Sequence, residues 1–400
     1  MECKLEDIFE FIRNGANIKQ GHIDGGYPIT RIETISNSYI DTSKVGYAGV
    51  CELGKFKDYL LKDGDILMSH INSEKHLGKT AIYENINEDI IHGMNLLCLR
   101  PNITKVVPKY INYYFNTKCF KIKLPKITKK SVNQASFSVN DLKNLYVYIP
   151  SLERQKKVAN VLDKAQSLID KRKVQIEALD ELVKSRFIEM FGEPKNNPNS
   201  YEMVPFDKVI KYIGDIGSNG ANSTISANLK MTDTEDYALM VRTLNFTSND
   251  FENNVKYVSK EVYEFFKKSK IFGGELIFNK IGSAGINFIM PYLNKPVSLG
   301  LNQIMVRTNE MINMVFLHNL LNTEYGKHQI NRRVQGAVTK SITKGAIKEI
   351  PILLPPIELQ KQFADFVKQV DKLKFEMEKS LRELEDNFNS LMQRAFKGEV

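Results

Sequence analysis

Two stretches of the chain carry apolar residues at the spacing of one face of a long helix. In the second stretch, apolar residues recur every seven positions over four heptads, which is typical of a coiled-coil seam. The first row there is Phe363, Val370, Met377, Leu384 and Leu391, and the second is Val367, Leu381, Phe388 and Ala395. The first stretch carries Val158, Val161, Leu162, Ala165, Leu168, Ile169, Ile176, Leu179, Val183, Phe187 and Met190. The pattern predicts two long helices that pair; two unrelated surface helices are the alternative.

Prolines and a glycine mark the limits of these helices. Pro150 and the pair Pro355-Pro356 precede them, at positions where a missing N–H does no harm. The first helix is expected over 151–192, ending at Phe191-Gly192, and a linker, EPKNNPNS, follows over 193–200. The second is expected over 356–400. At 1.5 Å per residue the first helix would span roughly 60 Å.

The regions that precede the helices contain short β-type runs and one short helix each. Gly, Asn and Ser clusters separate these runs. The expected strands are 66–68, 96–99, 145–149, 276–278, 304–306 and 350–354, and the expected short helices are 108–117 and 314–323. Two globules of mixed α and β structure follow from this, over 1–150 and 201–355.

The two halves of the chain repeat each other at an offset near 205 residues. SFSVNDLKNLYVYIPSLERQKKVA, from Ser136, matches SITKGAIKEIPILLPPIELQKQFA, from Ser341. The identical pairs are Ser136/Ser341, Lys143/Lys348, Pro150/Pro355, Glu153/Glu358, Gln155/Gln360, Lys156/Lys361 and Ala159/Ala364. The predicted fold is α+β: two mixed domains in a pseudo-twofold repeat, joined by two long antiparallel coiled-coil helices. One chain would then imitate a symmetric dimer, as two-headed DNA binders do.

Composition and charge bear on the binding partner and the cellular compartment of the protein. The 400 residues include 56 Lys and Arg and 47 Asp and Glu. The resulting net charge of +9 suits a nucleic-acid binder without proving one. Four scattered cysteines without a CxxC motif exclude a disulfide scaffold and a cysteine zinc site, and fit a reducing cytosol. The chain has no signal-peptide pattern and no apolar run of membrane-spanning length, so we expect a cytoplasmic protein without membrane contact.

No catalytic constellation is present in the sequence. LGKT, from Leu77, lacks the first glycine of a phosphate-binding loop, because Ser73 occupies that position. The glycines from Gly214 to Gly220 do not follow GxGxxG spacing, and the histidines do not follow HExxH spacing. His70 and His76 are interpreted as solvent or core histidines rather than metal ligands. The sequence therefore predicts no cofactor and no metal in this chain.

Two acid-free basic segments occupy matching places in the repeat. The segment 118–140 and the segment 327–348 carry no Asp or Glu, and each precedes the strand that leads into a long helix. Lysine and arginine supply phosphate contacts, and polar neighbours reach base edges. The candidates for DNA contact are Lys126, Lys129, Lys130, Asn133 and Gln134 in the first, and Arg332, Arg333, Gln335 and Lys340 in the second. The alternative is that both segments are solvated faces.

A second pair of candidate loops follows the expected strands at Ile66 and Leu276. These polar, glycine-containing loops, SHINSEKHLGKT and NKIGSAGINF, belong to a type that often carries binding residues. The DNA-contact candidates there are His70, Lys75, Lys79, Asn279, Lys280 and Ser283. Arg31 and Arg242 match across the repeat and join the candidates. A structural turn is the alternative role for each of these residues.

The order of these features resembles the DNA-specificity subunit of type I restriction–modification enzymes. The resemblance covers essentially the whole chain. Its most recognisable part is the Pro-x-x-Glu-x-Gln opening of each helix, with Gln155 and Gln360, and GDILMSHI and GELIFNKIGSAG resemble its strand-and-loop motif. The first half departs from the usual Gly-Ser loop with Asn72-Ser73-Glu74.

The resemblance implies a function without catalysis in this chain. Each target-recognition domain would read one half of a split site in double-stranded DNA, and the helices would set the spacing. Two methyltransferase subunits would dock on the helices, bind S-adenosylmethionine and methylate flipped-out adenine at N6. Where the system has them, two restriction subunits would use ATP and Mg. The alternatives are a stand-alone DNA-modifying enzyme with an unrecognised site, and a coiled-coil scaffold that does not bind DNA.

Overall fold

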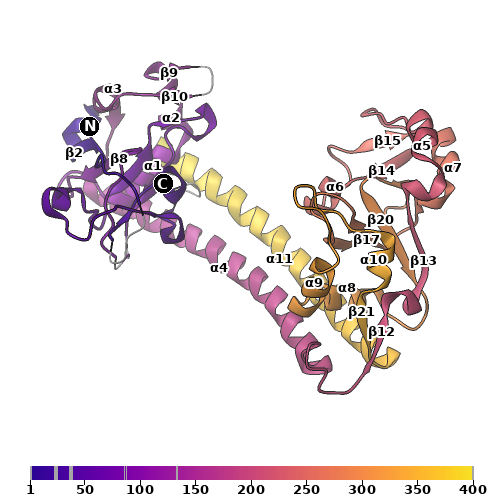
Figure 1. Ribbon diagram of the computed structural model, residues 1–400. Coiled ribbons are helices and arrows are strands. Elements are labelled where there is room, and N and C mark those ends of the chain that lie inside the picture. The colour runs from indigo at the N-terminus through magenta and orange to yellow at the C-terminus, as the bar shows by residue number, and fades with distance from the viewer. Residues whose placement is uncertain are drawn as a thin grey trace. The chain divides into compact units, whose positions relative to one another are not determined.

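The computed structural model describes residues 2–21, 26–35, 39–84, 86, 88–131 and 134–398. The chain divides into two compact units, which we call unit 1 (Met1–Lys173 with Lys379–Val400) and unit 2 (Val174–Glu378). The long helices α4 (Leu152–Phe191) and α11 (Ile357–Lys397) each contribute to both units (Figure 1).

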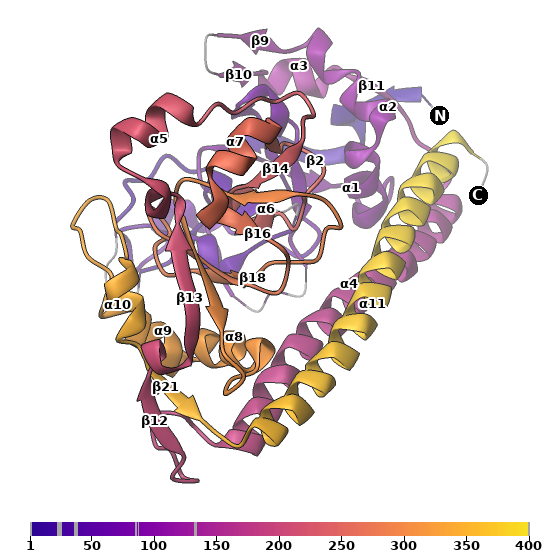
Figure 2. The ribbon, with the colours of Figure 1, turned by 90° about the vertical axis from the view of Figure 1, so that its right-hand side faces the viewer.

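Within each unit the two long helices run side by side and antiparallel (Figure 2). In unit 1 the Lys173 ammonium lies 3.1 Å from the Glu385 carboxylate, and the Arg154 guanidinium donates to the Gly398 carbonyl at 2.6 Å, so the start of α4 meets the end of α11. In unit 2 the rings of Phe187 and Phe363 meet edge to face, with their centres 5.4 Å apart. The expected antiparallel helix pair is confirmed. Leu168 is 54% exposed and lies outside the seam, because the buried row runs through Leu162 and Ile169.

Unit 1 is built on a four-stranded antiparallel sheet. Its strand order is β2 (Phe9–Asn14), β8 (Leu96–Pro101), β5 (Ile66–Ser69) and β7 (Thr80–Ile82). Strand β1 (Glu2–Lys4) pairs with β11 (Tyr146–Tyr148), which leads into α4. The other elements are η1 (Leu5–Ile8), β3 (Pro28–Ile29), η2 (Ile32–Ile35), η3 (Thr42–Lys44), β4 (Gly46–Tyr47), η4 (Gly54–Tyr59), β6 (Ile71–Asn72), η5 (Glu74–His76), α1 (Pro108–Asn116), α2 (Lys118–Lys121), η6 (Leu124–Lys126), β9 (Lys129–Lys130), β10 (Ala135–Ser136) and α3 (Val139–Lys143).

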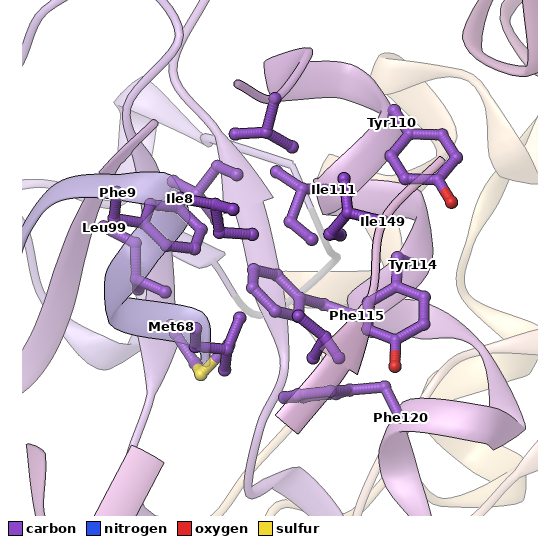
Figure 3. Close-up of a cluster of buried hydrophobic side chains, with 14 of the residues drawn as sticks. Ile8, Phe9, Met68, Leu99, Tyr110, Ile111, Tyr114, Phe115, Phe120 and Ile149 are labelled. Carbon is purple, nitrogen blue, oxygen red and sulfur yellow. The ribbon is translucent and has the colours of Figure 1, made fainter. Parts of the chain in front are cut away.

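The core of unit 1 joins the sheet to α1 and the long helices. Phe115 is fully buried between side chains of the sheet, such as Phe9, and the tyrosines of α1 (Figure 3). Val158 and Leu162 of α4 belong to the same cluster, and residues near the end of α11 pack against it. Burial of a large apolar side chain contributes roughly 1.5–3 kcal/mol. The helix pair is therefore part of the core of this unit.

Unit 2 repeats this plan. Its sheet order is β13 (Ile210–Asp215), β20 (Gln303–Thr308), β17 (Leu276–Asn279) and β18 (Asn287–Ile289), and β12 (Glu202–Pro205) pairs with β21 (Pro351–Leu354). A second sheet, in the order β15 (Lys256–Val258), β14 (Ala238–Val241), β19 (Val297–Leu299) and β16 (Lys270–Ile271), includes one parallel pair. The other elements are η7 (Phe206–Val209), η8 (Ile216–Asn219), α5 (Asn222–Asn228), α6 (Thr243–Thr247), α7 (Lys260–Phe265), η9 (Lys267–Ser269), α8 (Met314–Asn322), α9 (Glu324–Asn331) and α10 (Lys344–Lys348).

A buried ion pair marks the same place in both repeats. Arg100 donates two hydrogen bonds of 2.7 Å to the Asp65 carboxylate, which is 1% exposed. Arg307 likewise reaches the 4% exposed Glu275, at 3.1 and 3.2 Å. Each guanidinium also lies over an aromatic ring of the neighbouring strand: Arg100 over Phe11 and Arg307 over Tyr212. The predicted pseudo-repeat of two mixed α/β domains is confirmed at this level of detail.

Candidate nucleic-acid interface

A three-stranded sheet in unit 1 brings the two candidate segments of the first half together. β10 pairs antiparallel with both β6 and β9. In this register Ala135 lies opposite Asn72 on one side and opposite Lys130 on the other. The loop after β5 and the basic segment, 58 positions apart at Asn72 and Lys130, are therefore neighbours in space.

Unit 2 places its candidate segments in the same way. Ser341 bridges to Ile281 and to Gln335, so residues 335–341 form a narrow loop beside the loop that follows β17. The N–H of Ile342 donates to the Lys280 carbonyl at 2.9 Å, as the N–H of Phe137 donates to the His70 carbonyl at 3.1 Å. Both units thus use one arrangement to set a polar loop beside a basic segment.

A glycine turn and a helix cap shape the exposed loop 335–341. Gly336 has φ +100°, and a Cβ there would lie 2.2 Å from the Thr339 carbonyl oxygen, so this turn requires glycine. Val338, between them, is 97% exposed. Thr343 then caps α10 by accepting a 3.1 Å bond from the Ala346 N–H, which ends the loop and starts the helix.

In unit 1 most of the predicted contact residues lie on the surface. Lys130 forms a 2.7 Å ion pair with Glu74, and both side chains are well exposed. Lys79 is half-buried, and Asn133 lies outside the described residues. The remaining exposed members are Lys75, Lys126, Lys129 and Gln134. Their contacts with DNA stay predictions.

In unit 2 five predicted residues gather around the loop 335–341 and the loop after β17. Arg332 is exposed where α9 ends, and Lys280 is half-buried. The exposed residues of the two loops are Ser283, Gln335 and Lys340. The N–H of Gly282 donates to the Lys340 carbonyl at 3.0 Å, which holds the two loops together.

Two predicted contact residues are buried, which corrects the sequence-based assignment. His70 is 7% exposed and packs against the Phe137 ring, and burial lowers its pKa to about 4. It is therefore neutral at pH 7 and supplies no charge. Asn279 is fully buried and accepts a 2.7 Å bond from the Thr243 hydroxyl. The sequence does not distinguish them from exposed loop residues because both lie where a buried strand ends: His70 directly follows β5, and Asn279 is the last residue of β17.

Three predicted arginines are engaged by the protein itself. The Arg31 side chain donates to Gln20 at 2.7 Å and covers Gly46, beside β3 and β4. Arg242 donates to the Asn254 carbonyl. Arg333 donates to the carbonyls of Gln329 (2.9 Å) and Glu349 (2.8 Å), so it fastens the end of α9 to the end of α10. These bonds hold the three side chains within the protein, and their contacts with DNA stay predictions.

The structure also places two residues at this surface that were not among the candidates, Asp215 and Lys344. Asp215, at the end of β13, accepts hydrogen bonds from Lys280 (2.7 Å) and Lys344 (2.8 Å). Burial acts to raise the pKa of Asp215, but bonds from Lys280, Lys344 and Ser218 outweigh it and lower the pKa to about 2. Lys344 belongs to the acid-free segment, but its acidic partner lies 129 residues earlier in the chain.

Across the described part of the chain, no group of three or more His, Cys, Asp or Glu side chains is placed to hold a metal ion. Within those residues, no helix is both long enough and apolar enough to cross a membrane.

Two repeated α/β domains on an antiparallel helix pair, each with a matched polar and basic loop surface, define the class of DNA-specificity subunits. The chain belongs to the type I restriction modification DNA specificity family, whose model matches residues 1–178 and 205–385. It is a specificity subunit of a type I restriction–modification system.

Relatives and solved structures agree over nearly the whole chain. A protein of Methanocaldococcus jannaschii, named as the specificity subunit of the type I restriction enzyme MjaX, is 34% identical, covering 99% of this chain and 92% of its own. The StySPI specificity subunit of Salmonella potsdam is 22% identical, covering 94% and 83%. The S subunit of M. genitalium shares the fold at TM-score 0.53 and 12% identity, covering 99% of this chain and 96% of its own. A chain from a type I R-M system structure does so at TM-score 0.57 and 14% identity, covering 100% and 98%.

Proposed function

We propose that residues 1–150 and 201–355 are two target-recognition domains, each of which reads one half of a bipartite DNA site. The observation that carries this proposal is that Ser136 and Ser341, which match in the repeat, make equivalent backbone pairings in their own units. In each unit that serine sits on the strand or bridge that joins a polar loop to a basic segment. Two equivalent surfaces on one chain are what a split recognition site requires.

Each surface combines charge with hydrogen-bonding side chains. Lysine and arginine supply the salt-dependent affinity for phosphates, and amide and hydroxyl groups reach base edges. In the first domain the proposed contacts are Lys75, Lys79, Lys126, Lys129, Lys130, Asn133 and Gln134. In the second they are Lys280, Ser283, Arg332, Gln335 and Lys340.

The long helices, with the linker 193–200, serve as spacer and docking surface. Residues 151–192 and 356–400 would bind two methyltransferase subunits, and two restriction subunits where the system has them. S-adenosylmethionine then belongs to the methyltransferase, which methylates adenine at N6, and ATP and Mg belong to the restriction subunit. This chain contributes recognition and no catalysis.

A domain exchange tests the proposal. Residues 198–350 are replaced by the corresponding residues of a relative with a different target, and methylated adenines are mapped in cells that also carry the methyltransferase. We expect one half of the recognised site to change and the other half to stay. A change in both halves would contradict the assignment of one half-site to each domain. An absence of site-specific methylation with the unaltered chain would contradict the function itself.

A further inference from the structure

One carboxylate in unit 2 holds two ammonium groups at the base of the exposed loop 335–341. The Asp215 side chain is 4% exposed, and its two oxygens accept from different lysines: Oδ2 from Lys280 at 2.7 Å and Oδ1 from Lys344 at 2.8 Å. Ser218 completes the group, accepting a 3.0 Å bond from Lys344 and donating one of 3.0 Å to Asp215. The two lysine side chains remain 33% and 37% exposed. The carboxylate is therefore inside, and the cations reach solvent.

The charges of this group do not cancel. Two ammonium groups and one carboxylate leave a net charge of +1, and the low pKa of Asp215 keeps it ionised at all ordinary pH values. An ammonium has three N–H donors. Among the described residues, Lys280 gives one to this cluster and Lys344 gives two, so donors remain for an outside acceptor.

The position of the group points to the ligand. Lys280 is tied through its carbonyl to Ile342, and its neighbour Gly282 is tied to Lys340. The ammonium pair therefore sits beside the loop that carries the proposed DNA contacts of the second domain. A phosphodiester has one negative charge and two free oxygens, which suits two neighbouring ammonium groups with a net charge of +1.

The first domain has no such group at the equivalent positions. Asn14 ends β2 as Asp215 ends β13, and His70 takes the place of Lys280 in the matching backbone hydrogen bond. Val139 begins α3 as Lys344 begins α10. The pair of cations on a buried carboxylate is thus an addition to the second repeat and is not required by the shared fold.

We propose that Lys280 and Lys344 together bind one backbone phosphate of the second half-site, and that Asp215 is the residue that positions them. This inference rests on the proposed DNA-recognition function. It adds a bidentate phosphate site to the second domain, at positions where the first domain carries Asn14, His70 and Val139.

The test uses the full chain assembled with its methyltransferase subunits and a duplex that contains the mapped target. Each phosphate of the second half-site is replaced in turn by an uncharged methylphosphonate, and binding is measured for the unaltered chain, Lys280→Met and Lys344→Met. We expect each variant to bind the normal duplex roughly tenfold more weakly, with a salt slope lower by about one. At one phosphate position, methylphosphonate should weaken the unaltered complex but have little further effect in either variant. Lys208→Met, which removes an exposed lysine paired with Glu202, is the matched control and should bind normally.

A further variant separates geometry from net charge. Lys344→Met with Asp215→Asn restores the local charge of +1 and leaves no uncompensated buried carboxylate, so it also guards against misfolding of the single variant. We expect it to bind as weakly as Lys344→Met. Two results would overturn the proposed phosphate site of Lys280 and Lys344. One is binding equal to that of the unaltered chain, and the other is methylphosphonate effects that are the same in all variants at every position. If the unaltered complex does not prefer its target to a scrambled duplex, the proposed function fails instead.

Discussion

Gln155 and Gln360 make the same three hydrogen bonds in the two units. The Gln155 side chain accepts from the Val107 N–H at 2.8 Å and donates to the carbonyls of Lys105 and Pro150. Gln360 accepts from the Asn313 N–H at 2.8 Å and donates to the carbonyls of Met311 and Pro355. Both side chains are fully buried. The glutamine of the Pro-x-x-Glu-x-Gln motif therefore fastens the first turn of each long helix to the loop before α1 or α8.

Replacing either glutamine should destabilise its own unit. Gln155→Ala leaves the Val107 N–H and the Lys105 carbonyl without their side-chain partner, and an unsatisfied buried polar group costs about 1–3 kcal/mol. We expect a loss of about 2–4 kcal/mol in the free energy of unfolding. Urea denaturation of the full chain measures this loss, and hydrogen exchange should show faster exchange at Val107.

Gln166→Ala is the control for that experiment. Gln166 lies on the same helix, but its side chain donates to Asp170 at 2.9 Å, near the surface. Its removal should change the unfolding free energy by less than about 0.5 kcal/mol. Equal losses for Gln155→Ala and Gln166→Ala would show that the buried bonds add nothing.

The fold was largely predictable from the sequence because its signals are periodic or repeated. Heptad spacing identified α4 and α11, and the repeat identified matching strands such as β5 and β17. The second sheet of unit 2 gave no such signal, because β14 and β19 are parallel strands separated by 55 residues between Val241 and Val297. The first half has only a short counterpart, in which β3 pairs antiparallel with β4 and Ile29 forms a parallel bridge to Ile91, and these short runs gave no strand signal in the sequence.

The candidate site was predictable as two regions but not residue by residue. Composition identified the acid-free segments, and the strand pairing set each of them beside a polar loop. Whether a side chain such as Asn279 is buried depends on tertiary neighbours such as Thr243, which sequence spacing does not reveal. The role of Asp215 was hidden for the same reason, because both of its lysine partners come from distant segments.

Arginines 332 and 333, although adjacent, should respond differently to neutralisation. Arg332 is exposed, whereas Arg333 is bonded to the Gln329 and Glu349 carbonyls. We expect Arg332→Gln and Lys340→Gln each to lower the salt slope of DNA binding by about one unit. Arg333→Gln should instead lower the unfolding free energy and leave the slope unchanged. Binding titrations over a range of salt concentrations distinguish these results, and an unchanged slope for both Arg332 and Lys340 would place the loop away from DNA.

Asp215 should make the free energy of unfolding depend on pH. Its pKa is about 2 in the folded chain and about 3.9 in an unfolded one, so the group stabilises the fold above pH 4 and loses that contribution as the pH falls toward 2. The full contribution is about 2–3 kcal/mol, and about half of it should be gone at pH 3. The difference in unfolding free energy between the unaltered chain and Asp215→Asn isolates the effect from other carboxylates. A difference that is the same at pH 5 and pH 3 would contradict the ion-paired state.

The length of the helix pair should set the number of base pairs between the two half-sites. The sequence-based test inserts four residues between Ile169 and Val174, which adds about 6 Å along the axis and keeps the apolar face nearly in phase. Placed directly before Val174, this insertion lies between the Lys173–Glu385 and Asp180–Lys374 pairs, and a matching insertion between Met377 and Leu381 keeps both pairs in register.

The chain with both insertions should recognise the same two half-sites with a spacer one or two base pairs longer, since each base pair rises about 3.4 Å. The single insertion in α4 serves as its comparison, because it shifts one helix past the other by one turn and should cost stability as well. Mapping methylated adenines in cells that carry each variant with its methyltransferase gives both the half-sites and the spacer. An unchanged spacer in an active complex with both insertions would mean that the partner subunits, and not α4 and α11, fix the distance. A changed half-site would mean that the insertion disturbs a recognition domain, and Gln155 and Gln360, which anchor those domains to the helices, would be the first contacts to examine.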